Sequence, residues 1–179
     1  KEFIITVNAV NDKPFFNEIG QFNITEDSQL NELNISLNTS DTEDPITQFN
    51  FTITENNSLF TILQVENETG NFSFQPSANS TGVTTINITL YDQNGTSGYE
   101  VESTTFDIEI SAVNDKPFFN AIADFDLNAN FAVFELNLSD NISDVEDPDS
   151  QINYVVENNN TAALTTEFDL INGTGNLTI

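Results

Sequence analysis

Apolar and polar residues alternate along much of the chain. Phe49, Phe51 and Ile53 are separated by single polar residues, and the same period of two runs through residues 86–90 and 106–110. Successive side chains of a β-strand point to opposite faces, so each of these segments is predicted to be a strand with one buried face. Seven strands, joined by turn-rich segments, are expected at residues 16–25, 31–38, 47–54, 59–65, 71–75, 83–91 and 101–112.

The same alternation selects the apolar residues that share a buried face. Burial of each of these side chains is worth about 1.5–3 kcal/mol. Seven strands within about a hundred residues are typical of an immunoglobulin-like sandwich, in which two sheets enclose one core. The expected core residues are Phe22, Ile35, Phe49, Phe51, Phe72, Ile86, Ile88, Phe106 and Ile108.

A nine-residue segment occurs twice in the chain. Residues 9–17 read AVNDKPFFN, and residues 112–120 are identical, at an offset of 103. The same offset relates the acidic segment DTEDP at residues 41–45 to DVEDP at residues 144–148. Self-similarity at a fixed period indicates a tandem array, and a repeat of about a hundred residues is long enough to bury a core of its own.

The repeat divides the chain into three segments. Residues 11–113 are predicted to form one complete repeat, and residues 114–179 a second, truncated one. Residues 1–10 are predicted to be the last strand of a preceding repeat, because their alternating apolar positions match those of residues 106–110 at the same offset. We therefore expect the array to continue beyond both ends of this sequence.

Composition limits the chemistry that the chain can perform. It has 29 Asp and Glu against three Lys, a formal charge of −26, and neither Cys nor His. Thiolate and imidazole chemistry are therefore excluded, which leaves oxygen ligands suited to calcium or magnesium. Nucleic acids and anionic membrane surfaces require cationic patches, so neither is an expected partner. No segment approaches the ~18 apolar residues of a membrane span, so we expect no membrane insertion by this segment.

Five short motifs of the chain occur together in one known family. They are Val-Asn-Asp-x-Pro at residues 10–14, Glu-Asp at 26–27, the acidic turn at 41–45, Thr-Gly-Asn-Phe-x-Phe at 69–74 and Asp-x-Asn-Gly at 92–95. These motifs resemble the cadherin-like repeats of large bacterial and archaeal cell-surface proteins. The resemblance implies an all-β fold of tandem seven-stranded immunoglobulin/cadherin-like β-sandwiches with Greek-key topology. It also implies secretion, an extracellular location at the cell surface, and Ca2+ at the junctions between repeats.

The directions of the strands predict where the acidic loops gather. Successive strands run in alternate directions, so the loop between the second and third strands and the loop between the sixth and seventh lie at one pole. The incoming linker, Asn11 and Asp12, lies at the same pole. Clustered carboxylates repel one another unless a cation lies among them, and calcium takes about 6–8 oxygen ligands. The first predicted calcium site consists of Asn11, Asp12, Asp41, Glu43, Asp44, Asp92 and Asn94. The second, at the opposite pole, consists of Glu26, Asp27, Asn114, Asp115, Asp144, Glu146 and Asp147.

Each acidic turn taken alone also has a purely structural explanation, because Asp and Asn favour turns by bonding to their own backbone. The recurrence of Asp-x-Glu-Asp-Pro at matching positions, each time with an Asn-Asp linker, favours calcium. Two departures from the family predict fewer or weaker sites. Residues 76–82 lack the acidic pair that animal cadherins have there, and Ala129 and Asn130 replace Glu26 and Asp27 in the second repeat.

Asn-x-Ser/Thr acceptor sequences for N-glycosylation are more frequent than chance. The contents of Asn, Ser and Thr predict about 5 by chance, and 15 are present. A strand in which polar and apolar residues alternate produces sequences such as Asn-Ile-Thr, which accounts for part of this excess. N-glycosylation is predicted to account for the rest, so the protein is expected to be a glycoprotein. The acceptors are Asn23, Asn34, Asn38, Asn50, Asn56, Asn67, Asn71, Asn79, Asn87, Asn94, Asn137, Asn141, Asn159, Asn172 and Asn176.

The sequence favours a structural protein over an enzyme. A glycosidase would need a single pair of carboxylates about 5–10 Å apart, whereas the carboxylates here recur with the repeat. A module that binds a carbohydrate or protein ligand is the alternative, although carbohydrate sites usually expose Trp or Tyr and the aromatic residues here are mostly Phe at strand positions. We expect a calcium-stiffened adhesin stalk, or a component of a surface array or filament. Its partners would be neighbouring repeats of the same chain and like chains in that array.

Overall fold

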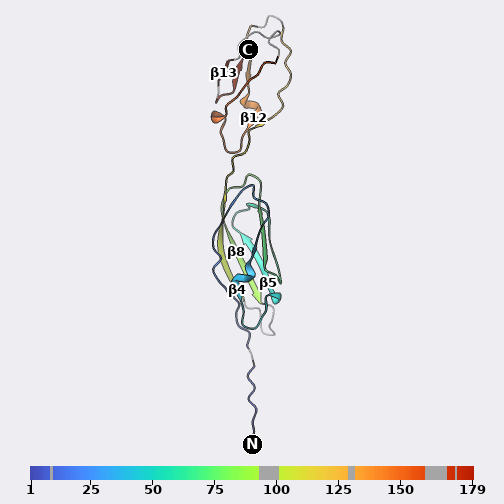
Figure 1. Cartoon of the computed structure of the whole chain (residues 1–179), viewed down its shortest axis with the longest axis vertical. Helices are drawn as coiled ribbons and strands as arrows, with labels where there is room; N and C mark the ends of the chain where they lie inside the picture. Colours follow the sequence, from blue (N-terminus) through green and yellow to red (C-terminus); the bar gives the residue numbers. More distant parts are fainter. Residues whose placement is uncertain (9, 93–100, 129–131, 160–168, 172) are drawn as a thin grey trace. The chain divides into compact units, whose positions relative to one another are not determined.

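The computed structural model describes residues 1–8, 10–92, 101–128, 132–159, 169–171 and 173–179 (Figure 1). The chain divides into two compact units, residues 1–113 and residues 114–179. Each unit has its own cluster of buried apolar side chains. The described elements are strands and short 3-10 helices, so the all-β fold class predicted from the sequence is confirmed.

The first unit contains a four-stranded and a three-stranded β-sheet, which form a sandwich, and a separate pair of two-residue strands. The larger sheet has the strand order β2 (Phe22–Thr25), β9 (Val101–Ser111), β8 (Gly82–Asp92), β5 (Phe49–Glu55). The smaller sheet has the order β3 (Asn31–Asn34), β7 (Asn71–Pro76), β6 (Phe60–Glu66). Neighbouring strands are antiparallel, except that β2 runs parallel to β9. Strands distant in sequence thus lie side by side in both sheets, as in a Greek-key sandwich.

The strand predicted at residues 16–25 is wrong as a single element. Its first part, β1 (Phe15–Phe16), pairs with β4 (Thr39–Ser40), whereas β2 pairs with β9. The chain therefore changes partners between the two parts. Asn17 N–H donates to Asn38 O at 2.7 Å and Asn38 Nδ2 donates to Glu18 O at 3.1 Å, and the chain then continues to β2 in the larger sheet.

The strand predicted at residues 31–38 is also too long. It ends at Asn34, and the 3-10 helix η1 (Ile35–Asn38) follows. The Asn34 side chain accepts a hydrogen bond from Ser36 N–H at 3.0 Å. Such a local bond offers the backbone an alternative to the sheet ladder, which ends the strand here.

The predicted core is confirmed with one exception. Eight of the nine expected residues are buried, while Phe22 is half-buried and packs edge-on against Phe106, with ring centroids 5.7 Å apart. Phe72 lies at the centre, stacked on Phe74 at 4.9 Å and edge-on to Phe106 at 5.9 Å. The cluster also contains buried residues that were not predicted, namely Phe16, Ile19, Phe74, Leu90 and Ile110.

The described part of the second unit repeats the strand pairings of two of the first unit's sheets. β10 (Phe118–Phe119) pairs with β12 (Ile142–Ser143), in the register that β1 and β4 have at an offset of 103. β11 (Glu135–Asn137) pairs with β14 (Asn176–Thr178), which also pairs with β13 (Asp169–Ile171). The 3-10 helices η3 (Ser139–Asn141) and η4 (Asp149–Gln151) complete the elements, and η4 corresponds to η2 (Ile46–Gln48) of the first unit. The internal repeat is therefore present in the structure as well as in the sequence.

One glycine position explains why the Thr-Gly-Asn motif recurs. Gly70 has φ +68°, and a Cβ there would lie 2.9 Å from Ser36 N. Gly175, its counterpart, has φ +66°, and a Cβ would lie 2.7 Å from Ser139 N. Only glycine combines this left-handed conformation with so close an approach to the capped turn.

The first eight residues carry exposed apolar side chains. Phe3, Ile5 and Val7 are 82%, 74% and 88% exposed, and residues 1–8 form no strand. A strand needs neighbours to be stable, so their placement in a preceding repeat stays a prediction. None of the helices in the described ranges is long and apolar enough to cross a membrane.

Glu55, at the end of β5, is expected to make the stability of the first unit depend on pH. Burial raises its pKa, against a smaller opposing effect of the Leu59 N–H. The folded state then holds the proton more tightly than the unfolded state, so this contribution to stability is complete at low pH and is lost as the pH rises through the folded pKa. Glu55→Gln should therefore raise the urea midpoint at neutral pH and leave it unchanged near pH ~4. An equal midpoint for variant and parent at both pH values would contradict this.

Candidate metal-binding site

The acidic turn at residues 41–45 is built around one carboxylate. Asp41 Oδ1 accepts hydrogen bonds from Glu43 N–H at 2.8 Å and from Asp44 N–H at 2.9 Å. One oxygen of Asp41 therefore shapes the turn. The other, Oδ2, is buried and makes no hydrogen bond within the described part of the chain. Leaving a buried charged oxygen unsatisfied is costly, so this atom is available to a cation.

The linker meets this turn and the end of β8. Asp12 N–H donates to Glu43 Oε2 at 3.1 Å, and Asn11 Nδ2 donates to Asp92 Oδ2. Asp92 and Asp44 are nearly fully buried, at 1% and 5% exposed. The structure thus brings the linker, the acidic turn and the end of β8 together at one pole, as the loop argument predicts. Asn94, the remaining residue of the first predicted set, lies outside the described residues.

The second unit builds the same turn. Asp144 Oδ1 accepts from Glu146 N–H at 3.1 Å and from Asp147 N–H at 2.9 Å, and Asp115 N–H donates to Glu146 Oε2 at 2.9 Å. Asp144 Oδ2 is again buried without a hydrogen bond among the residues that the structure describes. Asn114 Nδ2 donates to Asp115 O at 2.7 Å. An open hollow of about 600 Å³, lined in part by Asn114, Asp115, Ser143 and Asp144, lies beside the turn.

Glu26 lies at the other pole of the first unit. It is 3% exposed, and its Oε1 accepts a hydrogen bond from Val113 N–H at 2.8 Å. Its Oε2 is buried and has no hydrogen-bond partner in the described ranges. Asp27 is exposed. That Glu26 and Asp27 share a site with residues of the second repeat involves both units and stays a prediction, and Ala129 and Asn130 lie outside the described residues.

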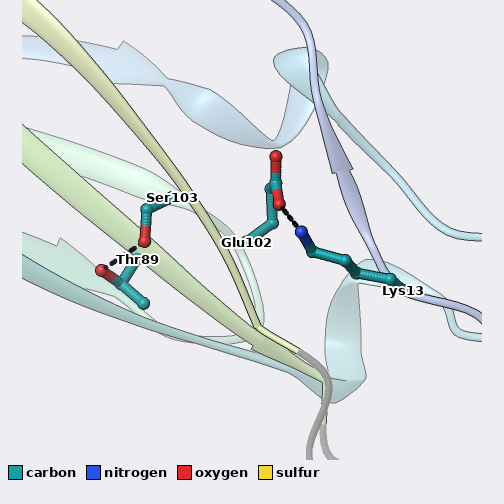
Figure 2. A network of polar contacts seen from close by, with 4 residues as sticks. All are labelled: Lys13, Thr89, Glu102 and Ser103. Atoms are coloured by element: carbon teal, nitrogen blue, oxygen red, sulfur yellow. Dashed lines mark hydrogen bonds and ion pairs between the residues drawn. The ribbon is translucent and has the colours of Figure 1, made fainter.

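Few cations of the chain itself can balance these carboxylates. The sequence has three lysines, no arginine and no histidine. Lys13, which follows the linker aspartate, forms an ion pair with Glu102 on β9 (Figure 2). The sequence did not predict this pair, because nothing in the pattern links residues so far apart. With Lys13 bound to Glu102, Asp41 has no ion pair within the ranges described.

The donor set fits a calcium ion in its chemistry. Carboxylate and amide oxygens are the ligands that calcium prefers, and Asp41 and Asp144 each hold one buried oxygen that has no hydrogen-bond partner among the described residues. Among the described residues, however, no group of three or more acidic side chains is already gathered closely enough to hold a metal ion. The side chains of the turn would therefore have to close on the ion.

The fold and the recurring turn define the chain as a tandem array of immunoglobulin-like β-sandwiches. A family model described as Bacterial Ig domain matches residues 11–108, more than half of the chain. The chain therefore belongs to this family, which is non-enzymatic. No curated protein matches the sequence.

Solved structures of similar fold include cadherin ectodomains. Protocadherin Gamma C5 EC1-3 aligns with a TM-score of 0.53 and 14% identity over 93% of this chain and 56% of that one. Mouse clustered PcdhgC3 EC1-3 has a TM-score of 0.46 and 18% identity, over 97% and 58%. Human Desmocollin-1 ectodomain has a TM-score of 0.44 and 10% identity, over 93% of this chain and 33% of that one. The chain spans at most 58% of these proteins. The cadherin-like resemblance is confirmed at the level of fold.

Proposed function

We propose that this chain is a calcium-stiffened structural segment of an extracellular cell-surface protein. The observation that carries the proposal is the acidic turn that occurs once in each unit, with the same backbone bonds and a buried carboxylate oxygen that nothing in the described ranges binds. A turn that served only its own backbone would not need to bury a second charged oxygen. The recurrence in both repeats supports a role in the array rather than a single catalytic site.

In the first unit, Asn11, Asp12, Asp41, Glu43, Asp44 and Asp92 would hold one calcium ion, with Asn94 as a further ligand. In the second unit, Asn114, Asp115, Asp144, Glu146 and Asp147 would hold another, and Glu26 and Asp27 are further candidate ligands. A bound ion would supply the positive charge that the chain lacks. Because the ligands come from the linker as well as from the loops, each ion would fasten a linker to the repeat that follows it.

Such an array fits a stalk that carries other domains away from the cell, or a surface lattice or filament of like chains. Residues 1–10 as the last strand of a preceding repeat, with repeats at 11–113 and 114–179, belong to this proposal. The sequence excess of acceptor asparagines supports a glycoprotein. The strong negative charge is compatible with a secreted surface coat.

The substitution Asp41→Asn tests the calcium site directly. The amide oxygen can still accept the N–H groups of Glu43 and Asp44, while Oδ2 is replaced by an uncharged NH2 group. We expect calcium affinity to fall at least about tenfold, because the affinity of such sites depends on ligand charge. Without calcium, the melting temperature should be equal to or above that of the parent, since one repelling charge is gone. Calorimetric titration and thermal melts measure both effects.

Glu18→Gln is the matched control, because it removes one negative charge from an exposed position outside the turn. It should leave the calcium-induced rise in melting temperature unchanged. If the parent chain shows no such rise at millimolar calcium, or if both variants lose it equally, the turn is not the binding site. Calcium that binds only the folded state must stabilise it.

A further inference from the structure

Three acceptor asparagines of the first unit combine an exposed side chain with an amide oxygen anchored by a backbone N–H group, a combination that the other described acceptors lack; Asn137 has the same kind of anchor, from Ser139 N–H, but is half-buried. The side chains of Asn34, Asn56 and Asn67 are exposed, and each is anchored through Oδ1 by a backbone N–H group. Their Nδ2 atoms make no hydrogen bond in the described part of the chain. The amide nitrogen, which is the atom that N-glycosylation modifies, is therefore left for solvent.

The anchors are strong and come from different elements. Asn67 Oδ1 accepts from Phe51 N–H at 2.7 Å, and Asn56 Oδ1 accepts from Thr85 N–H at 2.9 Å and from Thr84 Oγ1 at 3.0 Å. Asn34 Oδ1 accepts from Ser36 N–H and Oγ, at 3.0 and 2.6 Å. Fixing the oxygen fixes the side chain, so a group attached to Nδ2 would point away from the sandwich.

In two other acceptor asparagines, the Nδ2 atom donates a hydrogen bond within the protein. Asn38 is half-buried, and its Nδ2 donates to Glu18 O at 3.1 Å. Asn137 is also half-buried, and its Nδ2 donates to Asp140 Oδ1 at 3.0 Å. A bulky substituent on these atoms would crowd the protein or displace the bond. Asn94 and Asn172 lie outside the described residues.

We propose that Asn34, Asn56 and Asn67 are the N-glycan acceptor sites of the first repeat. In the transfer, Nδ2 forms a bond to the anomeric carbon of a lipid-linked oligosaccharide diphosphate. The bond from that carbon to the diphosphate breaks, the lipid diphosphate leaves, and one amide proton is lost. The proposal rests on the extracellular location in the proposed function, but not on calcium binding.

The position of Asn67 gives its glycan a physical consequence. β5 is an edge strand of the larger sheet, and Asn67 bonds to the backbone N–H of Phe51 on that strand. Exposed edges invite pairing with strands of other molecules. The turn already covers part of this edge, since Glu68 N–H donates to Phe49 O at 3.3 Å. A glycan on Asn67 would extend that cover and oppose such pairing.

Glycopeptide mass spectrometry of the protein isolated from the cells that make it tests the proposal. We expect sugar-bearing peptides for Asn34, Asn56 and Asn67, and unmodified peptides for Asn38 and Asn137. Unmodified Asn34, Asn56 and Asn67 would overturn the proposal. Modification of Asn38 to the same extent would overturn the geometric selection.

Thr69→Ala is the matched variant, because it removes the acceptor sequence at Asn67 but keeps the Asn67 side chain and its bond to Phe51. It should lose the mass of one glycan from the intact protein, with the other two retained and the calcium-induced rise in melting temperature unchanged. No loss of mass would show that Asn67 carries no glycan. A glycosylated chain without a calcium response would refute the calcium site alone, so the two proposals fail separately.

Discussion

Phe72→Ala is expected to cost the first repeat about 3–5 kcal/mol of unfolding free energy. The Phe72 side chain is fully buried, stacked on Phe74 at 4.9 Å and edge-on to Phe106 at 5.9 Å. Removing the ring loses its burial and leaves a cavity between the two sheets. In a domain of this size each kcal/mol lowers the melting temperature by roughly 4–8 °C. Urea unfolding followed by far-ultraviolet circular dichroism measures the effect.

Leu37→Ala is the control for this prediction. Leu37 lies in η1, close in sequence to the core residue Ile35, but its side chain is 81% exposed. Its substitution should change the unfolding free energy by no more than about 0.5 kcal/mol. If Phe72→Ala is as mild as Leu37→Ala, the packing described for the first unit is wrong.

The strands of the first unit could be predicted because one face of each is buried. Phe49, Phe51, Ile86 and Ile88 alternate with polar residues, and this period identifies both the element and its inner face. Ile19 was missed as a core residue because it lies between β1 and β2, where no alternation marks it. The end of β3 at Asn34 was missed because a side-chain bond, not hydrophobicity, ends that strand.

The proximity of the linker, the acidic turn and the end of β8 in the first unit could be predicted from the directions of the strands alone. The contacts of Asp12 with Glu43 and of Asn11 with Asp92 agree with that reasoning. The sequence could not predict that Asp41 Oδ1 binds the backbone of the turn while Oδ2 makes no hydrogen bond in the described part of the chain. This difference between the two oxygens depends on the φ and ψ angles of the loop. The Lys13–Glu102 ion pair was missed for a similar reason, since it depends on the path of the linker across β9.

The second prediction is that calcium controls the stiffness of the array more than the fold of each repeat. The backbone of the linker at residues 113–115 makes one hydrogen bond to a carboxylate in each unit. Val113 N–H is bound by Glu26 in the first unit, and Asp115 N–H is bound by Glu146 in the second. Each acceptor is a glutamate that is followed in the sequence by an aspartate, Asp27 and Asp147 respectively. Without a bound ion, repulsion between the carboxylates opposes these hydrogen bonds. A bound ion would offset that repulsion and hold the linker in place.

The core of the first unit is separate from these carboxylates, since it consists of Phe, Ile and Leu side chains on the inner faces of the two sheets. Chelation of calcium should therefore release the linkers while the β-sheets remain. We expect the far-ultraviolet circular dichroism spectrum to persist at ordinary temperature, with a lower melting temperature, because a ligand of the folded state has been removed. Loss of the β-sheet signal on chelation would mean that calcium creates the fold.

Small-angle X-ray scattering of this chain, with calcium and with a chelator, measures directly whether calcium stiffens the array. We expect a larger maximum dimension and a narrower distance distribution with calcium, and a broad, more compact distribution in the chelator. Asp41→Asn should leave the response of the second unit's linker intact, whereas Asp144→Asn should abolish most of the change between the two conditions. Identical distance distributions of the parent chain with calcium and with chelator would show that calcium does not stiffen the linker.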